Sequence, residues 1–244
     1  MLAPSQQLVR REGAGSGLGA SKLCGVPSAP LSETAQDYLK EIYKLQTEAG
    51  RAATSAIAER VGVAPPSVTA MLKKLAALGL VEHEPYRGAQ LTRTGEKAAI
   101  EVIRHHRLLE VYLSETLGLA IEDVHAEAER LEHALSEELE ARIDESLGYP
   151  THDPHGDPIP DAKLNLERST VRPLAELQPG ERATIRRVPD EDPALLRYLS
   201  SLALLPGKAV KLVGCAPFGG PVTVMAEGAE HAISRELAGQ IGVG

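Results

Sequence analysis

The sequence predicts a mainly α-helical protein with a small share of β-structure, built as an N-terminal winged helix-turn-helix, a second helical domain and a small C-terminal β-barrel. Three observations predict this class. Residues 33–92 follow the order helix, short helix, turn, longer helix and β-hairpin. Histidines and glutamates recur at helical spacing between residues 106 and 133. After Arg172 the pattern changes to short alternating strands separated by glycine- and proline-containing turns.

Composition restricts the class of protein further. Apolar residues make up 43% of the 244 residues but aromatic residues only 3%, so the core must be built from Leu, Ala, Val and Ile. The two cysteines, Cys24 and Cys215, follow no metal or redox spacing, which is typical of a reducing cytoplasm. No apolar run reaches transmembrane length, so we expect a cytoplasmic protein without a membrane partner. The first 30 residues contain no continuous apolar segment of the secretory type.

These patterns divide the chain into four segments. We expect a disordered arm over 1–30, a DNA-binding domain over 31–98, a helical metal-binding and dimerisation domain over 99–165, and the barrel over 166–244. The Pro- and Asp-rich stretch 149–170 marks the last boundary.

The winged helix-turn-helix is predicted element by element. Apolar positions at helical spacing predict a helix over 33–47. Thr54 is a plausible N-cap for a short helix that Gly62 ends. Pro65 and Pro66 open a longer helix, since proline is tolerated in a first turn. Two short strands, 80–84 and 89–92, then flank the turn Pro85-Tyr86-Arg87-Gly88.

The longer helix is expected to enter the major groove of double-stranded DNA. Small residues near its start allow close approach, and lysines on its flank can meet phosphates, which position a protein without reading sequence. The candidate DNA-binding residues are Pro66, Ser67, Thr69, Ala70, Lys73 and Lys74, with Arg87 on the wing. A plain helical bundle with a surface hairpin is the alternative. The net charge of −8 does not exclude DNA, because 12 of the acidic residues lie in 105–148, whereas 31–104 is near balance with 10 basic and 9 acidic residues.

The run HAEAERLEH is the most specific chemical pattern. His125, Glu129, Glu132 and His133 stand at i, i+4, i+7 and i+8, within about a 100° sector of one helix. His106 and Glu110 form a second i, i+4 pair in the preceding helix, expected from Thr94 onward. Such nitrogen and oxygen ligands suit Mn²⁺, Fe²⁺, Co²⁺ or Zn²⁺ better than a thiolate-preferring metal. A solvated glutamate-rich face is the alternative.

We expect 121–148 to form one helix with a flanking apolar stripe. The stripe comprises Val124, Ala128, Leu131, Leu135, Leu139 and Ile143. Such a stripe is commonly buried against another helix, and a symmetric homodimer would match a palindromic operator. A monomeric core is the alternative.

The order of these parts resembles the diphtheria toxin repressor family of metal-dependent transcriptional regulators. The resemblance covers residues 31–244 and rests on SETAQDYLKEIYKL, PPSVTAMLKKLAALGLVEHEPYRGAQLTRTGEKAA, HHRLLEVYL, VHAEAERLEH and DPHGDPIP. The stretch LALLPGKAVKLVGCAPFGGPVTV resembles the SH3-like domain of that family, also found in FeoA-type proteins. The resemblance implies a repressor of metal-uptake genes, without enzymatic activity, that uses metal as corepressor.

The resemblance also implies two metal sites per subunit. His106, Glu110 and His125 match the ancillary site, whereas Asp37, Glu129, Glu132 and His133 match the primary site. Iron regulators have Met at Asp37 and Cys at Glu129, and manganese regulators have Asp and Glu there, so the ligands favour Mn²⁺, with Fe²⁺ as the alternative.

Several positions depart from the family pattern. Lys40 stands where short manganese regulators have another glutamate, so a closely paired two-metal centre is not expected. In the barrel, Asp190 and Glu191 are candidate ligands, and an acidic surface loop is the alternative. Arg107 matches an anion-contact position, but Asp153 and Asp157 replace its usual partners, so no anion is inferred. Three further histidines are expected at the surface: His105, His152 and His155.

A metallohydrolase and a metal-independent winged-helix regulator that binds a small ligand are the rival functions. The first lacks any H-E-x-x-H motif or phosphate-binding loop, and metal content would discriminate the second.

Overall fold

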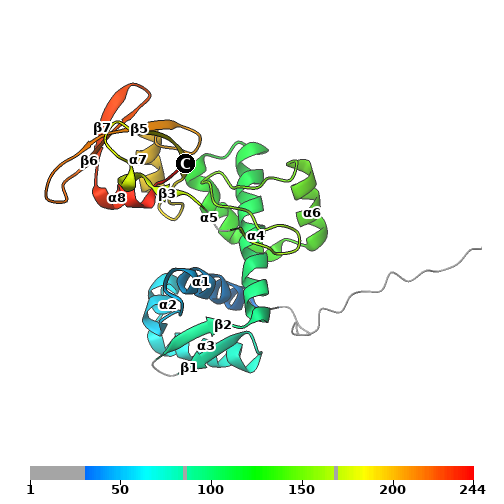
Figure 1. The fold of residues 1–244 in the computed structure, drawn as a ribbon. Helices are drawn as coiled ribbons and strands as arrows, with labels where there is room; N and C mark the ends of the chain where they lie inside the picture. The colour runs from blue at the N-terminus through cyan, green and yellow to red at the C-terminus, as the bar shows by residue number, and fades with distance from the viewer. Residues whose placement is uncertain (1–30, 85–86, 168–169) are drawn as a thin grey trace, which may run out of the picture.

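A computed structural model describes residues 31–84, 87–167 and 170–244. The chain forms three successive bodies (Figure 1): a long helix joins the N-terminal domain to the central helices, and a linker whose described residues form no helix leads from these to the C-terminal sheet. The expected arm 1–30 and the tip of the expected wing turn, residues 85–86, lie outside the described residues. The mainly helical class with a C-terminal β-domain is confirmed.

The N-terminal domain has the predicted order of elements. It contains α1 (Glu33–Ala49), α2 (Thr54–Val61), α3 (Pro65–Ala77), and the antiparallel pair β1 (Val81–Glu84) and β2 (Gly88–Leu91). Ser32 caps α1 by accepting a hydrogen bond from the Ala35 amide. Thr54 is the first helical residue of α2 and not its cap, because the cap position is Ala53, which makes no side-chain cap.

The second body begins with the long helix α4 (Arg93–Glu115), whose N-cap is Thr92. The expected single helix over 121–148 is wrong. The chain instead forms α5 (Ile121–Leu131), a 3₁₀ turn (Glu132–Ala134) and α6 (Glu137–Ser146). Leu135 is extended and Ser136 caps α6 through the Leu139 amide, so the backbone starts a new helix there.

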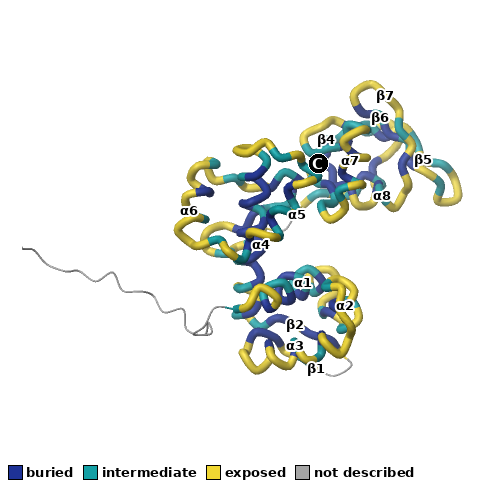
Figure 2. Tube along the Cα trace, turned by 180° about the vertical axis from the view of Figure 1, so that it is seen from behind, coloured by how far each residue is buried: buried dark blue, intermediate teal, exposed yellow. Residues whose placement is uncertain are grey.

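This break changes which faces are buried. Val124, Ala128 and Ile143 pack against α4 in one core, whereas Leu131 and Leu139 are 43% and 49% exposed. The apolar stripe inferred from one continuous helix therefore divides into a buried part and an exposed part, which Figure 2 shows as exposed α6 beside buried α4.

The C-terminal domain is a six-stranded antiparallel sheet in the order β3-β8-β4-β5-β6-β7. Its strands are β3 (Arg172–Pro173), β4 (Arg182–Arg187), β5 (Ala209–Cys215), β6 (Val222–Ala226), β7 (Ala229–Ile233) and β8 (Gly242–Val243). Its helices are the 3₁₀ turn Leu174–Glu176, α7 (Pro193–Ser201) and α8 (Arg235–Gln240).

Two helices of this domain were not expected from the alternating pattern. The stretch HAISREL is a strand only as far as Ile233, after which Ser234 caps α8 through the Leu237 amide. Two of the three leucines of α7, Leu196 and Leu199, are fully buried in the core of this domain. Within the described residues, no helix is long and apolar enough to cross a membrane.

Candidate metal centre

Three neighbouring groups of histidines and carboxylates lie between the three bodies. The outer group is Asp37, Glu132 and His133, and the inner group is Glu110, Asp153 and His155. The middle group lies between them and comprises His106, Glu110 and His125, with Glu129 and Asp190 at its edge. The outer and inner groups, and the two overlapping triplets of the middle group (His106, His125 and Glu129; Glu110, His125 and Asp190), each have ligand atoms within 4.8 Å of one another.

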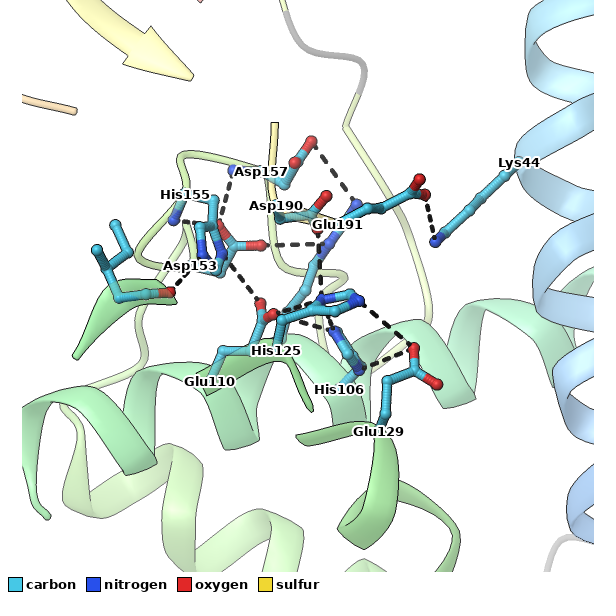
Figure 3. Close-up of polar contacts among 12 residues, drawn as sticks. Lys44, His106, Glu110, His125, Glu129, Asp153, His155, Asp157, Asp190 and Glu191 are labelled. Carbon is cyan, nitrogen blue, oxygen red and sulfur yellow. Dashed lines mark hydrogen bonds and ion pairs between the residues drawn. The ribbon is translucent and has the colours of Figure 1, made fainter. Parts of the chain in front are cut away.

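The structure brings together the three residues predicted as ancillary ligands. His106 Nε2 and His125 Nδ1 lie 3.0 Å and 3.1 Å from the same Glu110 Oε1, and 3.1 Å from each other. Asp190 Oδ2 approaches His125 Nδ1 to 3.8 Å from the loop before α7. Figure 3 shows these side chains converging from α4, α5 and the C-terminal domain.

The outer group joins the N-terminal domain to the second body. Asp37 of α1 lies 2.9 Å from His133 Nε2, which is also 3.6 Å from Glu132 Oε1. Gln36 Oε1 lies 2.6 Å from the other ring nitrogen of His133 and so orients the imidazole. The helix break after Leu131 brings Glu132 and His133 to this position, because both belong to the 3₁₀ turn rather than to α5.

Glu129 lies elsewhere than its predicted place beside Asp37. It approaches His106 Nδ1 and His125 Nε2 at 3.7 Å and 3.9 Å, and it accepts a 2.6 Å hydrogen bond from Lys40 Nζ. The same ammonium donates to Glu132 Oε1, also at 2.6 Å. Lys40 is 3% exposed and therefore places a fixed positive charge between the outer and middle groups.

The inner group was not predicted. His155, which we expected at the surface, is fully buried, and its Nε2 lies 3.0 Å from the Ile121 carbonyl oxygen. That contact leaves Nδ1 directed at Glu110 Oε2, 3.6 Å away. Asp153 accepts hydrogen bonds from the amides of His155 and Asp157 through Oδ1 alone. The histidine–aspartate spacing in DPHGDP was the available signal, but a proline-rich linker is ordinarily exposed.

The inner group fits a divalent cation. Glu110 Oε2, Asp153 Oδ2 and His155 Nδ1 are buried, and none of the three has a hydrogen-bond partner among the described residues. Leaving three such atoms unsatisfied is costly, and one shared cation would satisfy all of them. Two carboxylates and an imidazole form the oxygen- and nitrogen-rich donor set that Mn²⁺ or Fe²⁺ accepts.

The electrostatics of the metal-free groups show how much charge is concentrated there. Burial lowers the pKa of His106, but hydrogen bonds to Glu110 and Glu132 raise it to about 9. Burial lowers and Glu110 raises the pKa of His155, again to about 9. Burial, together with the charges of Glu110 and Asp157, raises the pKa of Asp153 to about 7. The imidazoles of His106 and His155 therefore carry protons at neutral pH, so metal binding must displace protons.

His105 is also buried, contrary to the expected surface position. Its ring lies 2.9 Å from Glu140 Oε2 and 3.2 Å from the Glu132 carbonyl oxygen. Arg104 donates to Glu140 and to Asp144, at 2.5 Å and 2.6 Å. This network ties the 3₁₀ turn to α6. His152, by contrast, is exposed as expected.

Glu191 departs from the predicted ligand set. Its carboxylate contacts Arg60 Nη1 at 3.2 Å and Lys44 Nζ at 3.6 Å, and it belongs to none of the described groups. Arg107 lies 3.5 Å from Asp153 and 3.7 Å from Asp157, so its guanidinium is paired with two carboxylates of the chain.

The linker packs very closely on the C-terminal sheet beside the inner group. Gly156 has φ +94°, and a Cβ at this position would lie 1.7 Å from the Arg186 carbonyl oxygen of β4. His155 accepts a 2.9 Å hydrogen bond from the Val188 amide through its own carbonyl oxygen. Only glycine permits both the backbone conformation and this contact.

The edge of the middle group faces an open cleft of about 800 Å³. Lys40, His106, Glu129 and Asp190 line it, together with residues of the linker. The cleft therefore provides a polar entry route for a hydrated cation to the middle group.

The predicted DNA-binding residues form a separate surface. Val68, Leu72 and Leu75 bury one face of α3, and the opposite face is exposed. On that face Pro66, Ser67, Ala70, Lys73 and Lys74 are exposed and Thr69 is half-buried. Arg87, in the turn just before β2, is exposed and donates to Glu84 at 3.1 Å. Among the described residues neither Lys73 nor Lys74 has an ion-pair partner, so both are available to phosphates.

Comparison with known families matches nearly the whole described chain. Residues 30–89 match the iron dependent repressor N-terminal DNA binding domain, and residues 92–161 match the iron dependent repressor metal binding and dimerisation domain. Residues 172–244 match the FeoA domain. The iron-dependent repressor IdeR of Mycobacterium tuberculosis is 34% identical over 222 residues, which are 85% of this chain and 95% of that protein.

This chain belongs to the diphtheria toxin repressor and IdeR family of metal-dependent transcriptional repressors.

Solved structures of the family include regulators of both metals. A manganese-dependent transcriptional repressor in complex with manganese has a TM-score of 0.77 and 38% identity, and covers 86% of this chain and 98% of that one. The IdeR of T. acidophilum has a TM-score of 0.70 and 32% identity, and covers 85% and 96% of the two chains. The diphtheria toxin repressor of Corynebacterium diphtheriae is 38% identical over 130 residues, which are 53% of this chain and 58% of that protein.

Proposed function

We propose that this repressor responds to Mn²⁺ and binds two ions per subunit, one at the outer group and one at the middle and inner groups. Asp37, Glu132 and His133 would hold the first ion, with Glu129 reaching it once released from Lys40. His106, Glu110, His125 and Asp190 would hold the second, and Asp153 and His155 add donors beside it. Carboxylates in place of sulfur ligands favour the harder cation.

The observation that carries this proposal is the position of the outer group across two bodies. Asp37 belongs to α1 of the DNA-binding domain, whereas Glu132 and His133 belong to the turn after α5. A bound divalent cation supplies the positive charge that lets these side chains close on one point. The protein's part is to hold α1 in a fixed relation to α5 and thereby fix the position of α3.

We propose a palindromic operator and a homodimer for the assembled repressor. Leu131 and Leu139 are exposed on the domain matched as the dimerisation domain, and Leu117 and Tyr149 are exposed nearby at 57% and 65%. A symmetric pair would bury these side chains and present two copies of α3 to successive half-sites. Sedimentation of Leu131→Glu should give a monomer, with Tyr198→Glu in the C-terminal domain as the control.

The metal proposal is tested on the full chain. Calorimetric titration with MnCl₂ should give about two ions per subunit, and duplexes selected from a random pool in the presence of MnCl₂ should be released by chelation. Binding of the selected duplex with equal affinity after chelation would refute the metal switch. The same titration with FeCl₂ under anaerobic conditions tests the iron alternative, which the iron-dependent name of the IdeR relative supports.

The proposed phosphate contacts predict a specific salt dependence. Lys73→Ala should weaken binding to the selected duplex and lower the slope of log affinity against log salt by about 1. Lys163→Ala, an exposed lysine in the linker, is the matched control and should leave the slope unchanged. An unchanged slope in Lys73→Ala would exclude α3 as the DNA-contacting surface.

A further inference from the structure

The loop between β4 and α7, residues 188–192, contacts two other bodies through adjacent side chains. Asp190 Oδ2 lies 3.8 Å from His125 Nδ1 in the middle group. Glu191 Oε1 lies 3.2 Å from Arg60 of α2 and 3.6 Å from Lys44 of α1. Figure 3 shows Asp190 above the histidines and Glu191 directed at Lys44.

The receiving surface on the DNA-binding domain is a small charged cluster with carboxylates of its own. Lys44 pairs with Glu41 at 3.3 Å, and Arg60 pairs with Glu48 at 3.2 Å and with Glu41 at 3.6 Å. Burial alone would lower the pKa of Lys44, but Glu41, Asp190 and Glu191 together raise it. The C-terminal loop is therefore part of the electrostatic surroundings of α1.

The loop is fastened at both ends, so its two acidic residues must move together. Val188 is fully buried, and its amide donates to the His155 carbonyl oxygen at 2.9 Å. Asp192 caps α7 by accepting from the Ala194 amide at 2.8 Å. Consecutive Cα atoms are about 3.8 Å apart, so a shift of Asp190 toward the histidines is transmitted directly to Glu191.

We propose that residues 188–192 couple the FeoA domain to the DNA-binding domain. Asp190 contacts the middle group and responds to its occupancy, and Glu191 holds α1 and α2 through Lys44 and Arg60. The regulatory part of this inference rests on the proposed metal binding at the middle group. It assigns the C-terminal domain a direct mechanical role: the loop restrains the DNA-binding domain through the Glu191 contacts with α1 and α2.

Glu48 offers a matched control for Glu191. Both carboxylates lie 3.2 Å from Arg60 Nη atoms, and their side chains are 60% and 59% exposed. Glu48 belongs to α1, so Glu48→Gln removes a carboxylate from Arg60 without altering any contact between bodies. Glu191→Gln removes the equivalent charge from across the interface.

The test measures the distance between bodies by fluorescence energy transfer in the full chain. Dyes are attached at Ser55→Cys of α2 and Ser200→Cys of α7, both exposed, after Cys24→Ser and Cys215→Ser. In the metal-free protein, Glu191→Gln should broaden the distribution of transfer efficiencies, whereas Glu48→Gln should match the unsubstituted protein. The MnCl₂ concentration at which the transfer efficiency has completed half of its change should rise about 2- to 5-fold in Glu191→Gln but not in Glu48→Gln. An effect of this size is expected for the loss of exposed ion pairs.

Identical behaviour of Glu191→Gln and Glu48→Gln, both without metal and across the titration, would overturn the coupling. Calorimetry separates this failure from that of the proposed function. If the unsubstituted protein binds no Mn²⁺, the metal proposal fails, and the metal-free comparison of the two variants still decides whether the loop restrains the DNA-binding domain.

Discussion

The outer and inner groups differ in how the metal-free protein balances their charges. In the outer group, Asp37 is 39% exposed, and the buried ammonium of Lys40 bridges Glu132 to Glu129. In the inner group, Glu110 and His155 are fully buried, and polar atoms are left without hydrogen-bond partners. The outer group is thus balanced by the ammonium of Lys40 and can open to water, whereas the inner group is closed to water and its nearest guanidinium, that of Arg107, lies 3.5 Å from Asp153. We expect the first to act as a hinge point and the second as a structural site.

The largest expected effect removes the ammonium of Lys40. Lys40→Met leaves Glu129 and Glu132 facing each other, one of them fully buried, so the free energy of unfolding of the metal-free protein should fall by about 3 kcal/mol. Urea denaturation measures this. Mn²⁺ should then stabilise the variant more than the unsubstituted protein.

The control for this change is Lys208→Met. Lys208 also lies 2.6 Å from a carboxylate, that of Glu227, but both side chains are about half exposed. Its loss should cost less than about 1 kcal/mol. Equal losses for the two lysines would show that Lys40 is not a buried charge.

The next effect concerns the carboxylate shared by the middle and inner groups. Glu110→Gln should lower the affinity for the second Mn²⁺ by about 100-fold and reduce the ion count toward one. Loss of a residue that only orients a metal ligand already costs about 10- to 100-fold in affinity. Metal analysis after dialysis measures the count. Glu115→Gln, exposed on the same helix, should bind as the unsubstituted protein does. Retention of two ions by Glu110→Gln would remove Glu110 from the site.

Asp37→Asn tests the opposite end of the comparison. Because Asp37 is half-exposed and contacts only one residue of the turn closely, we expect about 10-fold weaker binding at the outer group and little change in metal-free stability. Calorimetry and urea denaturation measure the two quantities. Glu33→Gln, exposed on the same helix, serves as control. A loss of both ions on Asp37→Asn would mean that the two sites do not fill independently.

Much of this site was predictable from the sequence, and the reason for the rest is physical. Helical spacing found His106, Glu110 and His125, because α4 and α5 are regular there. The same spacing misplaced Glu129, since the helix ends at Leu131 and separates it from Glu132. Ser136 followed by two glutamates is an N-cap signature that marks this break.

The remaining residues could not be found from local patterns. Asp153 and His155 lie in a linker whose burial depends on the C-terminal sheet packing against it. The helix α7 follows a strand-like stretch, and its Asp192-Pro193 start is the local signal for it. The winged helix was predictable in full order because each of its turns has a proline or glycine at the required position.

The smallest expected effect is a pH dependence that arises at His106 and His155. The folded pKa of His106 and of His155 is raised from 6.5 to about 9, so their stabilising charge is fully present below pH 6.5 and is lost as pH rises through about 9. In chelator, the Tm should therefore fall, on the order of 5 °C between pH 7 and pH 8.5. His155→Gln should flatten this fall and Asp37→Asn should not; a Tm independent of pH in the unsubstituted protein would contradict it.

The close approach of Gly156 to the Arg186 carbonyl oxygen means that the inner group exists only while the FeoA sheet is seated against the linker. Deleting the sheet, or displacing it through the substitution Gly156→Ala, would allow the side chains of His155 and Asp153 to turn into solvent. The C-terminal domain therefore holds the linker residues of the inner group against Glu110 of α4. Deleting this domain would disrupt the inner group, although none of its three side chains belongs to the C-terminal domain.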